Sequence, residues 1–405
     1  MSDMSFMDKL LDGVAVEWKA LGDVVSLQRG KRLIKSQLEE VGRYAVFQNS
    51  MTPLGYYHES NVKADTAFVI AAGAAGEVGY SGVEFWAADD VYFCLPSADI
   101  NQKYLYHFLL MKKNEILSQV RRASIPRLSK TVVEKLEIPI PCPEKPEKSL
   151  EIQAEIVRIL DAFTELTTEL TTELTTELTT RKKQYNYYRD KLLSFEDGEV
   201  EWKTLRDVGD FTYGYAAKAQ DTGDARFVRI TDINSDGKLI ETDSKYVDIS
   251  EENEKYILKK SDLLMARTGA TYGKTMIFEE DYPAIYAGFL IKLSLDDTII
   301  NPKFYWHFAQ SDFFWDQANK LASGGGQPQF NANALKEVKM PIPFPENPDK
   351  SLAEQARIVA ILDKFDALTN SISEGLPREI TLRQKQYEYY RDLLLSFPKS
   401  EEVAA

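Results

Sequence analysis

The sequence is poor in the residues that build metal sites, disulfides and membrane spans. Cys94 and Cys142 are the only cysteines, three histidines are present, and no CxxC pair occurs. This excludes a CxxC zinc site and argues against a disulfide framework. The longest apolar run, near residues 68–76, is too short to cross a bilayer, and no basic segment leads into an apolar stretch at the start. These absences predict a soluble protein of the reducing cytoplasm.

Positive charge is also in short supply. The chain carries 49 Lys and Arg against 63 Asp and Glu, a formal net charge of −14. Because Lys and Arg supply most non-specific affinity for phosphate, this balance argues against tight nucleic-acid binding by the chain alone. Residues 1–148 hold 18 basic and 19 acidic residues, whereas residues 196–350 hold 18 and 27. If the chain binds DNA, we expect a basic partner to contribute.

The motifs of common catalytic centres are missing. The sequence has no Asn-Pro-Pro-aromatic motif for amino methylation, no cluster of metal ligands and no nucleophile elbow. Residues 269–275 (GATYGKT) resemble a phosphate-binding loop, but they are one residue too short for the GxxxxGK[ST] spacing. We therefore expect neither a cofactor nor catalysis.

What the sequence does have is a long internal duplication. The matched segments are 16–21 (VEWKAL) with 200–205 (VEWKTL), 100–103 with 300–303, 138–141 (IPIP) with 340–343 (MPIP), 156–163 (IVRILDAF) with 358–365 (IVAILDKF), and 181–195 (RKKQYNYYRDKLLSF) with 383–397 (RQKQYEYYRDLLLSF). The last three pairs share an offset of 202 residues, so the segments between them are equally long although they differ in sequence. A repeat of this length indicates the architecture before any motif is considered.

Each copy is predicted to be a globular domain followed by a long helix. Residues 150–195 contain no Gly or Pro, and their apolar residues recur every three or four positions, as on one face of a helix. In the second copy we expect a kink or a new start near Pro377, because proline cannot donate to the preceding turn. The predicted boundaries are a first domain over 1–149, a helix over 150–196, a second domain over 197–350, a helix over 351–397 and a tail over 398–405.

Strands and helices are mixed in both globular domains. Runs bounded by Gly, Asn and Pro predict strands at 44–48, 67–71, 91–95, 227–230 and 290–293, and residues 102–119 and 302–321 are predicted helices. Two long helices with apolar faces should pair with each other. The chain also begins with a copy of its own helix ending. We therefore expect an α+β fold in which two mixed domains are separated by two long antiparallel helices, with pseudo-two-fold symmetry.

Taken together, these features resemble a known family. The order of domain and helix, the IPIP segment before IVRILD and the RKKQYNYYRDKLLSF ending are similar to specificity subunits of type I restriction-modification enzymes. The TTEL tetrapeptide, repeated three times at 167–178, resembles the type IC subgroup. The resemblance covers essentially the whole chain. It implies two target recognition domains that each read half of a split sequence in double-stranded DNA. It also implies two methyltransferase subunits as partners, motor and endonuclease subunits in the full complex, and no catalysis by the chain itself.

In the second domain the candidate DNA contacts lie around residues 266–274 (ARTGATYGK), a segment that resembles a loop common in the family's recognition domains. Its glycines allow the backbone to approach DNA closely. We expect Arg267 to contact a guanine edge and Lys274 a phosphate, with Thr268 and Gly269 completing the loop. The alternative is a tight turn that carries a solvated arginine.

Further candidates in the second domain are Tyr213, which aligns with Arg29 of the first, and a glycine-rich segment at 323–330 (SGGGQPQF). Gln327 and Gln329 in this segment both have the amide that reads adenine. The alternative is a surface loop without a role.

The first domain keeps the glycines at 71–79, Gly73 among them, but lacks the arginine and the lysine of the second. Its chemistry must therefore differ. The candidates there are two polar and basic groups, one beside Gly30 (Gln28, Arg29, Lys31 and Arg32) and one around Pro126 (Arg121, Arg122 and Arg127). Either group is equally compatible with a solvated face.

A last set of candidates lies at the ends of the long helices and comprises Tyr185, Tyr188 and Leu192 with their repeats Tyr387, Tyr390 and Leu394. Their simplest role is packing between the helices. Because the set occurs twice, it also predicts a docking surface for two methyltransferase subunits.

Two other classes of function compete with DNA recognition. A coiled-coil scaffold would use its globular domains to bind peptides, and binding of a defined duplex by the complex with methyltransferase would exclude it. A hydrolase with an unrecognised site would show activity as the purified chain, but the sequence offers no convergent nucleophile, base and orienting residue.

Overall fold

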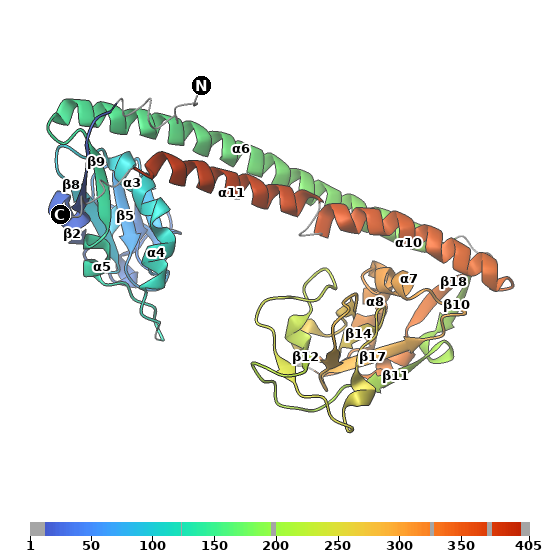
Figure 1. The fold of residues 1–405 in the computed structure, drawn as a ribbon. Helices are drawn as coiled ribbons and strands as arrows, with labels where there is room; N and C mark the ends of the chain where they lie inside the picture. The colour runs from blue at the N-terminus through green and yellow to red at the C-terminus, as the bar shows by residue number, and fades with distance from the viewer. Residues whose placement is uncertain (1–12, 123, 196–199, 325–327, 371–374, 398–405) are drawn as a thin grey trace, which may run out of the picture. The chain divides into compact units, whose positions relative to one another are not determined.

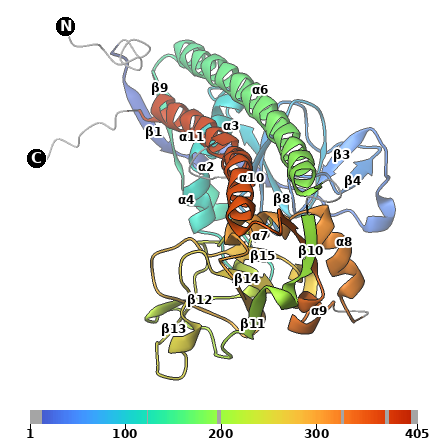
Figure 2. The same ribbon diagram turned by 90° about the vertical axis from the view of Figure 1, so that its right-hand side faces the viewer.

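The computed structural model describes residues 13–122, 124–195, 200–324, 328–370 and 375–397. The chain divides into two compact units. The first unit comprises Met1–Thr172 and Thr381–Ala405, and the second unit comprises Glu173–Ile380. Each unit therefore combines one globular domain with parts of the long helices, which can be followed in Figures 1 and 2.

The first unit contains the strands β1 (Val16–Ala20), β2 (Val25–Arg29), β3 (Tyr44–Phe47), β4 (Gly55–Tyr57), β5 (Thr66–Ile70), β6 (Val78–Ser81), β7 (Trp86–Ala87), β8 (Val91–Pro96) and β9 (Glu137–Pro141). Its short helices are α2 (Leu21–Val24), η1 (Lys35–Gln37), α3 (Gln102–Met111), α4 (Lys113–Ser118) and α5 (Lys130–Glu134).

The second unit contains the strands β10 (Val200–Thr204), β11 (Gly209–Tyr213), β12 (Ala225–Val228), β13 (Tyr246–Val247), β14 (Leu263–Ala266), β15 (Thr275–Ile277), β16 (Ala284–Tyr286), β17 (Leu290–Leu295) and β18 (Lys339–Pro343). Its short helices are η2 (Leu205–Asp207), η3 (Ile230–Asp232), η4 (Glu254–Tyr256), η5 (Gly269–Thr271), α7 (Pro302–Phe308), α8 (Asp312–Leu321) and α9 (Ala332–Lys336).

The two units have the same sheet plan. The first has a four-stranded sheet in the order β2-β8-β5-β6, a three-stranded sheet β4-β3-β7 and the pair β1-β9. The second has β11-β17-β14-β15, β13-β12-β16 and β10-β18 in the same roles. Both four-stranded sheets are antiparallel throughout. The two-domain α+β fold expected from the sequence is therefore confirmed.

Two of the repeated sequence segments are partners in one small sheet. Val16 on β1 pairs with Pro141 on β9, and Val200 on β10 pairs with Pro343 on β18. The VEWK and IPIP motifs therefore recur together because each is the other's strand partner. Each pair leads directly into the long helix that follows its domain.

The long helices are α6 (Pro146–Leu193), α10 (Pro348–Asn370) and α11 (Gly375–Leu395). The helix predicted to begin at residue 150 begins at Pro146 instead, because the first turn of a helix tolerates proline, whose missing N–H would have no partner there. In the second copy α11 begins at Gly375, so Pro377 lies in the first turn of a new helix. No helix in the described ranges is long and apolar enough to cross a membrane.

The predicted helices over 102–119 and 302–321 are each two helices. In the first, α3 ends before Lys112, whose backbone leaves the helical region at ψ 2°. In the second, Ser311 starts a new helix by accepting a hydrogen bond from the Phe314 N–H at 3.4 Å. A side chain that caps a helix competes with the continuation of the preceding helix, so Ser311 is a sequence signal for this break.

Each globular domain is tied to its long helix by the same contacts. Gln153 on α6 accepts a hydrogen bond from the Asn101 N–H at 2.8 Å, and Gln355 on α10 accepts one from the Asn301 N–H at 2.9 Å. Both glutamines are fully buried. The helix also completes the hydrophobic core of its domain, for example with Ile156 in the first unit and Ile358 in the second.

Within each unit two long helices also pack on each other. In the first unit Phe163 stacks on Tyr390 with ring centroids 5.4 Å apart, and the Thr164 hydroxyl lies 3.1 Å from that of Tyr387. These pairings run in opposite chain directions, so α6 and α11 are antiparallel there. In the second unit Tyr188 stacks on Phe365 at 5.6 Å.

Candidate nucleic-acid interface

One end of each four-stranded sheet collects most of the predicted DNA contacts. Because the strands alternate in direction, β2 and β5 finish at the end where β8 and β6 begin, and β11 and β14 finish where β17 and β15 begin. We call these ends the loop ends. The loop end of the first unit comprises residues 28–31, 71–77 and 88–90, and that of the second comprises 213–215, 267–274 and 287–289.

A glycine holds the chain against the sheet at both loop ends. The Gly30 N–H donates to the Val91 carbonyl at 3.0 Å, and the Gly214 N–H donates to the Leu290 carbonyl at 3.1 Å. A Cβ atom at Gly30 would lie 2.2 Å from the Ala88 carbonyl oxygen, and one at Gly214 would be equally crowded. Gly30 and Gly214 therefore occupy equivalent positions in the two units, which agrees with the predicted alignment of Arg29 with Tyr213.

Arg29 is anchored at the loop end of the first unit. Its Nε donates to the Asp89 carbonyl at 2.6 Å, while the side chain is exposed. Lys31 and Arg32 follow on the exposed chain, and Gln28 uses its amide to donate to the Ser26 hydroxyl. All four residues of this predicted group are thus exposed at or next to the loop end of the first unit.

Arg267 occupies the loop end of the second unit between two aromatic rings. Its guanidinium carbon lies 5.1 Å from the centre of the Tyr213 ring and 5.3 Å from that of Phe289. Its Nε donates to the Gly288 carbonyl at 3.2 Å. The rings orient the charge by cation–π attraction. The structure therefore brings together Tyr213 and Arg267, which are far apart in the sequence.

The glycine loops are held by a second loop that arrives after the helices α4 and α8. The Gly73 N–H donates to the Pro126 carbonyl at 3.1 Å, and the Gly269 N–H donates to the Pro328 carbonyl at 3.0 Å. Both glycines have positive φ, 80° and 72°. This left-handed conformation favours glycine, which explains why both copies keep it.

The second loop has basic residues in only one of the two copies. In the first unit Arg121 and Arg127 exchange two backbone hydrogen bonds, and the side chains of both, like that of Arg122, are exposed. In the second unit Ser323 and Gln329 make the same exchange, and Gln329 is exposed. Gln327 lies outside the described residues. The two units therefore offer different polar groups on one framework.

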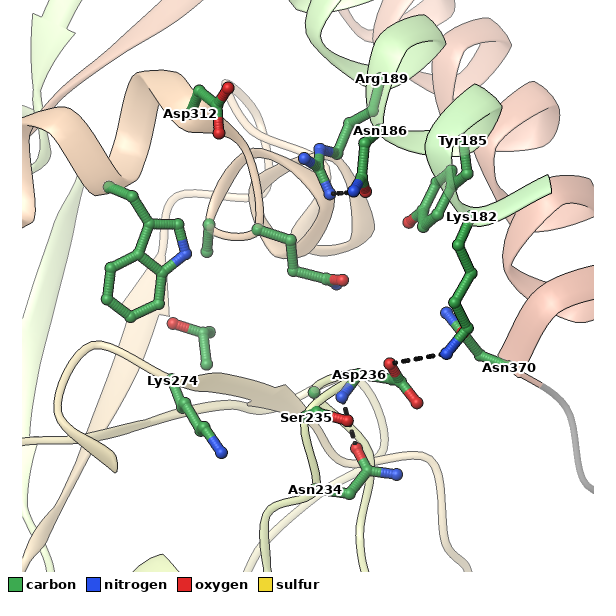
Figure 3. A pocket seen from close by; sticks show the side chains of 15 residues that line it. Lys182, Tyr185, Asn186, Arg189, Asn234, Ser235, Asp236, Lys274, Asp312 and Asn370 are labelled. Carbon is green, nitrogen blue, oxygen red and sulfur yellow. Dashed lines mark hydrogen bonds and ion pairs between the residues drawn. The ribbon is translucent and has the colours of Figure 1, made fainter. Parts of the chain in front are cut away.

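Lys274 and Arg267 have different surroundings. It lines a cavity of about 320 Å³ in the second unit, together with Lys182 and Arg189 of α6. Figure 3 shows Lys274 on the wall opposite these two residues, with Asp236 between them. Asp236 forms an ion pair with Lys182 at 3.7 Å. The predicted phosphate contact of Lys274 therefore stays a prediction that the geometry does not strengthen.

Phe289 is a site residue that the sequence does not indicate. Its side chain is 56% exposed, and its ring flanks the guanidinium of Arg267. A lone phenylalanine before a strand carries no functional signal by itself. Only the pairing of β14 with β17, in which Ala266 lies opposite Leu290, places it beside the arginine.

The residues predicted to dock methyltransferase differ in exposure. Tyr185 is 3% exposed and Leu394 is 6% exposed, which corrects the docking prediction for these two, because side chains buried in their own unit have no surface to offer. Leu192, Tyr387 and Tyr390 are partly buried, and Tyr188 is 43% exposed. The most exposed aromatic residues of these helix ends are Tyr187 and Tyr389, at 61% and 64%.

His107 and His307 are buried in the cores of the two units. Burial lowers the pKa of His107 and of His307 below the usual value, although each imidazole is within hydrogen-bonding distance of an aspartate, Asp161 at 3.1 Å and Asp363 at 2.9 Å. Within the described residues no group of three or more His, Cys, Asp or Glu side chains is arranged to hold a metal ion.

Comparison with known proteins bears directly on this duplicated arrangement. A family model described as "Type I restriction modification DNA specificity domain" matches residues 14–180 and, a second time, residues 198–382. The chain belongs to this family.

Known specificity subunits are similar along their whole length. The type I restriction enzyme EcoR124I/EcoR124II specificity subunit of Escherichia coli is 36% identical over 426 residues, covering 100% of both chains. The EcoprrI specificity subunit of the same species is 31% identical over 412 residues, covering 92% of this chain and 93% of the relative. A solved structure described under complex assembly and conformational transition of the type I R-M system has a TM-score of 0.60 at 14% identity. It covers 94% of this chain and 97% of its own, and it supports the fold.

Proposed function

We propose that this chain is the DNA-specificity subunit of a type I restriction-modification enzyme and that it reads a split target, one half with each loop end. It is a non-catalytic component of the complex. The observation that carries this function is the loop end itself, which is built twice on one framework with different polar side chains. A duplicated scaffold with divergent surfaces is what two independent readers of sequence require.

The polar groups at the loop ends and on the neighbouring second loops have the chemistry of base and backbone contacts. Arginine binds guanine in the major groove with two parallel hydrogen bonds, glutamine binds adenine in the same way, and main-chain N–H groups beside glycine suit phosphate. In the first unit we assign DNA contact to Gln28, Arg29, Lys31, Arg32, Gly73, Arg121, Arg122 and Arg127. In the second unit we assign it to Tyr213, Arg267, Thr268, Gly269, Lys274, Gln327 and Gln329.

Partner subunits supply what the chain lacks. Its net charge of −14 opposes a DNA backbone, so a basic partner must provide much of the phosphate neutralisation. We assign this role to two methyltransferase subunits, which dock on the exposed aromatic helix ends around Tyr188 and Tyr390. Motor and endonuclease subunits join this complex for cleavage, and the cytoplasm is its proposed location.

The test is binding of DNA by the chain reconstituted with its methyltransferase. Specificity requires that a duplex with the correct half-sites binds at least a thousandfold more tightly than unrelated DNA at the same salt concentration, the lower end for sequence-specific proteins. Equal affinity for all duplexes would favour a peptide-binding scaffold instead. Hydrolytic activity of the purified chain would contradict a non-catalytic role.

A further inference from the structure

We propose that Arg29 and Arg267 have the same recognition role in the two units although they are attached to non-equivalent strands. Each arginine reads a base edge in its own half-site. This inference rests on the proposed function and deepens it. It selects one guanidinium in each unit as a specificity determinant from the larger sets of polar residues at the loop ends.

The two arginines use the same backbone anchor. Arg29 Nε donates to the Asp89 carbonyl, and Arg267 Nε donates to the Gly288 carbonyl. Asp89 and Gly288 are equivalent positions, because each lies two residues before the strand residue that accepts the N–H of Gly30 or of Gly214. Each guanidinium therefore starts from the same point of the shared framework.

The two arginines lie at the ends of strands that are not equivalent in the two units. Arg29 is the last residue of β2, and the corresponding residue of β11 is Tyr213. Arg267 follows β14, and the corresponding residue after β5 is Ala71.

The correspondence of Ala71 with Arg267 follows from main-chain hydrogen bonds. The Ala71 carbonyl accepts from the Leu128 N–H and the Arg267 carbonyl from the Phe330 N–H, both at 2.8 Å. Neither strand position carries arginine in both copies, yet each loop end contains one guanidinium on the shared anchor.

The anchoring hydrogen bond uses only Nε and does not involve the Nη groups, which are the part of the guanidinium that reads bases. The two Nη groups still offer four N–H donors, and the planar fork matches the O6 and N7 acceptors of guanine. In the ranges that the structure describes, neither arginine forms an ion pair with a carboxylate. Other arginines do so readily, as Arg229 does with Asp232 at 2.7 Å. In these ranges the positive charge of the two arginines is therefore not neutralised by a carboxylate ion pair.

Arg29→Ala and Arg267→Ala, each in the full chain reconstituted with methyltransferase, test the two roles. Each should weaken binding to the cognate duplex by roughly 5- to 150-fold, leave binding to unrelated DNA unchanged, and relax the requirement at one half-site only. The two variants must affect opposite half-sites. Arg158→Ala and Arg357→Ala, which remove exposed arginines that pair with Glu155 on α6 and Glu354 on α10, serve as controls and should change neither half-site.

A transfer experiment tests the shared position directly. Arg29→Tyr should lose the specificity of the first half-site. The double variant Arg29→Tyr with Ala71→Arg copies the second unit, returns a guanidinium to the Asp89 carbonyl from the other strand, and should recover most of that loss. Arg29→Lys, which alters the structure little, retains the charge without the fork and should bind unrelated DNA normally while discriminating poorly.

The outcomes separate the inference from the proposed function. If Arg29→Ala weakens all duplexes equally, the arginine contacts phosphate and the inference is overturned. The inference also fails, with the proposed function intact, if the wild-type complex binds a split target and neither alanine variant changes its specificity. If the wild-type complex binds no split target, both are overturned.

Discussion

The hydroxyl of Tyr185 lies 3.0 Å from Nδ1 of His307, and both side chains are buried in the second unit. The repeat of this pair in the first unit is not formed. Tyr387 is directed to the Thr164 hydroxyl, and Nδ1 of His107 has no hydrogen-bond partner among the described residues. Tyr185 and His307 thus form a hydrogen bond between the long helix and the globular domain of the second unit. The corresponding residues of the first unit, Tyr387 and His107, do not.

This asymmetry predicts unequal effects of matched substitutions. Tyr185→Phe leaves Nδ1 of His307 buried without its partner and should lower the free energy of unfolding by about 1 to 3 kcal/mol. Tyr387→Phe removes a partly exposed contact and should cost less than about 1 kcal/mol. Urea unfolding of the full chain, followed by circular dichroism, measures both. Equal losses would show that the Tyr185–His307 contact contributes nothing of its own.

The buried histidines predict a loss of stability in mild acid. Burial lowers the pKa of His307, and the hydrogen bond to Asp363 does not offset it, so the unfolded chain binds a proton that the folded chain resists. The stabilising contribution is therefore complete above the unfolded pKa of about 6.5 and is lost as the pH falls below it.

The corresponding measurement compares unfolding free energies near neutral pH and about one unit below the unfolded pKa of histidine. His307→Gln and His107→Gln should each reduce the dependence on pH, because each removes one depressed pKa. His58→Gln is the matched control, since His58 is exposed. An unchanged pH dependence in both buried variants would contradict the assignment.

The exposed tyrosines predict where methyltransferase docks. Tyr187 and Tyr389 occupy the same position in the two helix endings, and each meets the following tyrosine edge to face, with ring centroids 5.3 and 5.5 Å apart. Tyr187→Ala or Tyr389→Ala should each weaken one of two docking events roughly tenfold or more, as for an aromatic interface residue. The double variant should weaken both.

Native mass spectrometry of the chain titrated with methyltransferase counts the bound subunits. The single variants should favour one bound subunit at concentrations where the wild-type chain binds two. Tyr282→Ala, which removes another exposed tyrosine, serves as the control. Two subunits bound to the double variant at wild-type affinity would exclude this surface.

The TTEL array predicts the length of the unread DNA spacer. The array lies within the continuous helix α6, and the boundary between the two units falls inside it, between Thr172 and Glu173. Deletion of residues 171–174 would shorten a straight helix by about 6 Å and rotate its ends by a net 40° or so. One base pair of B-DNA corresponds to about 3.4 Å and roughly 35°.

The rotation therefore fits one base pair, while the surplus translation of about 2 to 3 Å can be absorbed by bending of the long helices. We expect the deletion to shorten the spacer by one base pair and to leave both half-sites unchanged. Sequencing of N6-methyladenine in cells with the deleted chain decides this. Altered half-sites, or an active enzyme with the original spacer, would show that α6 does not set the spacing.

Much of the fold could be predicted because repeats reveal which segments belong together. The VEWK and IPIP segments recur in both copies because β1 pairs with β9 and β10 with β18. The alignment of Gly30 with Gly214 could be read from the sequence alone. The structure explains why both positions are glycine, since a side chain at either one would meet a carbonyl oxygen.

The assembled loop ends could not be predicted in the same way. Gly73 meets Pro126, and Gly269 meets Pro328, only after the three strands and two α-helices that separate them in the sequence have folded. The common anchor of Arg29 and Arg267 is invisible in an alignment because the two arginines occupy different columns. The burial of Tyr185 likewise depends on the packing of α6 against its domain, whereas the tyrosine pattern itself is the same in both copies.

The most direct test of the account is the methylome of cells that express this chain with its methyltransferase, compared with cells that lack the chain. The account predicts N6-methyladenine in a two-part motif, with two specified half-sites separated by a spacer of unspecified bases. It further predicts that Arg267→Ala relaxes one half-site and leaves the other as it was. Methylation in a single uninterrupted motif, or the same methylation with and without the chain, would contradict the claim that the two units read a split target.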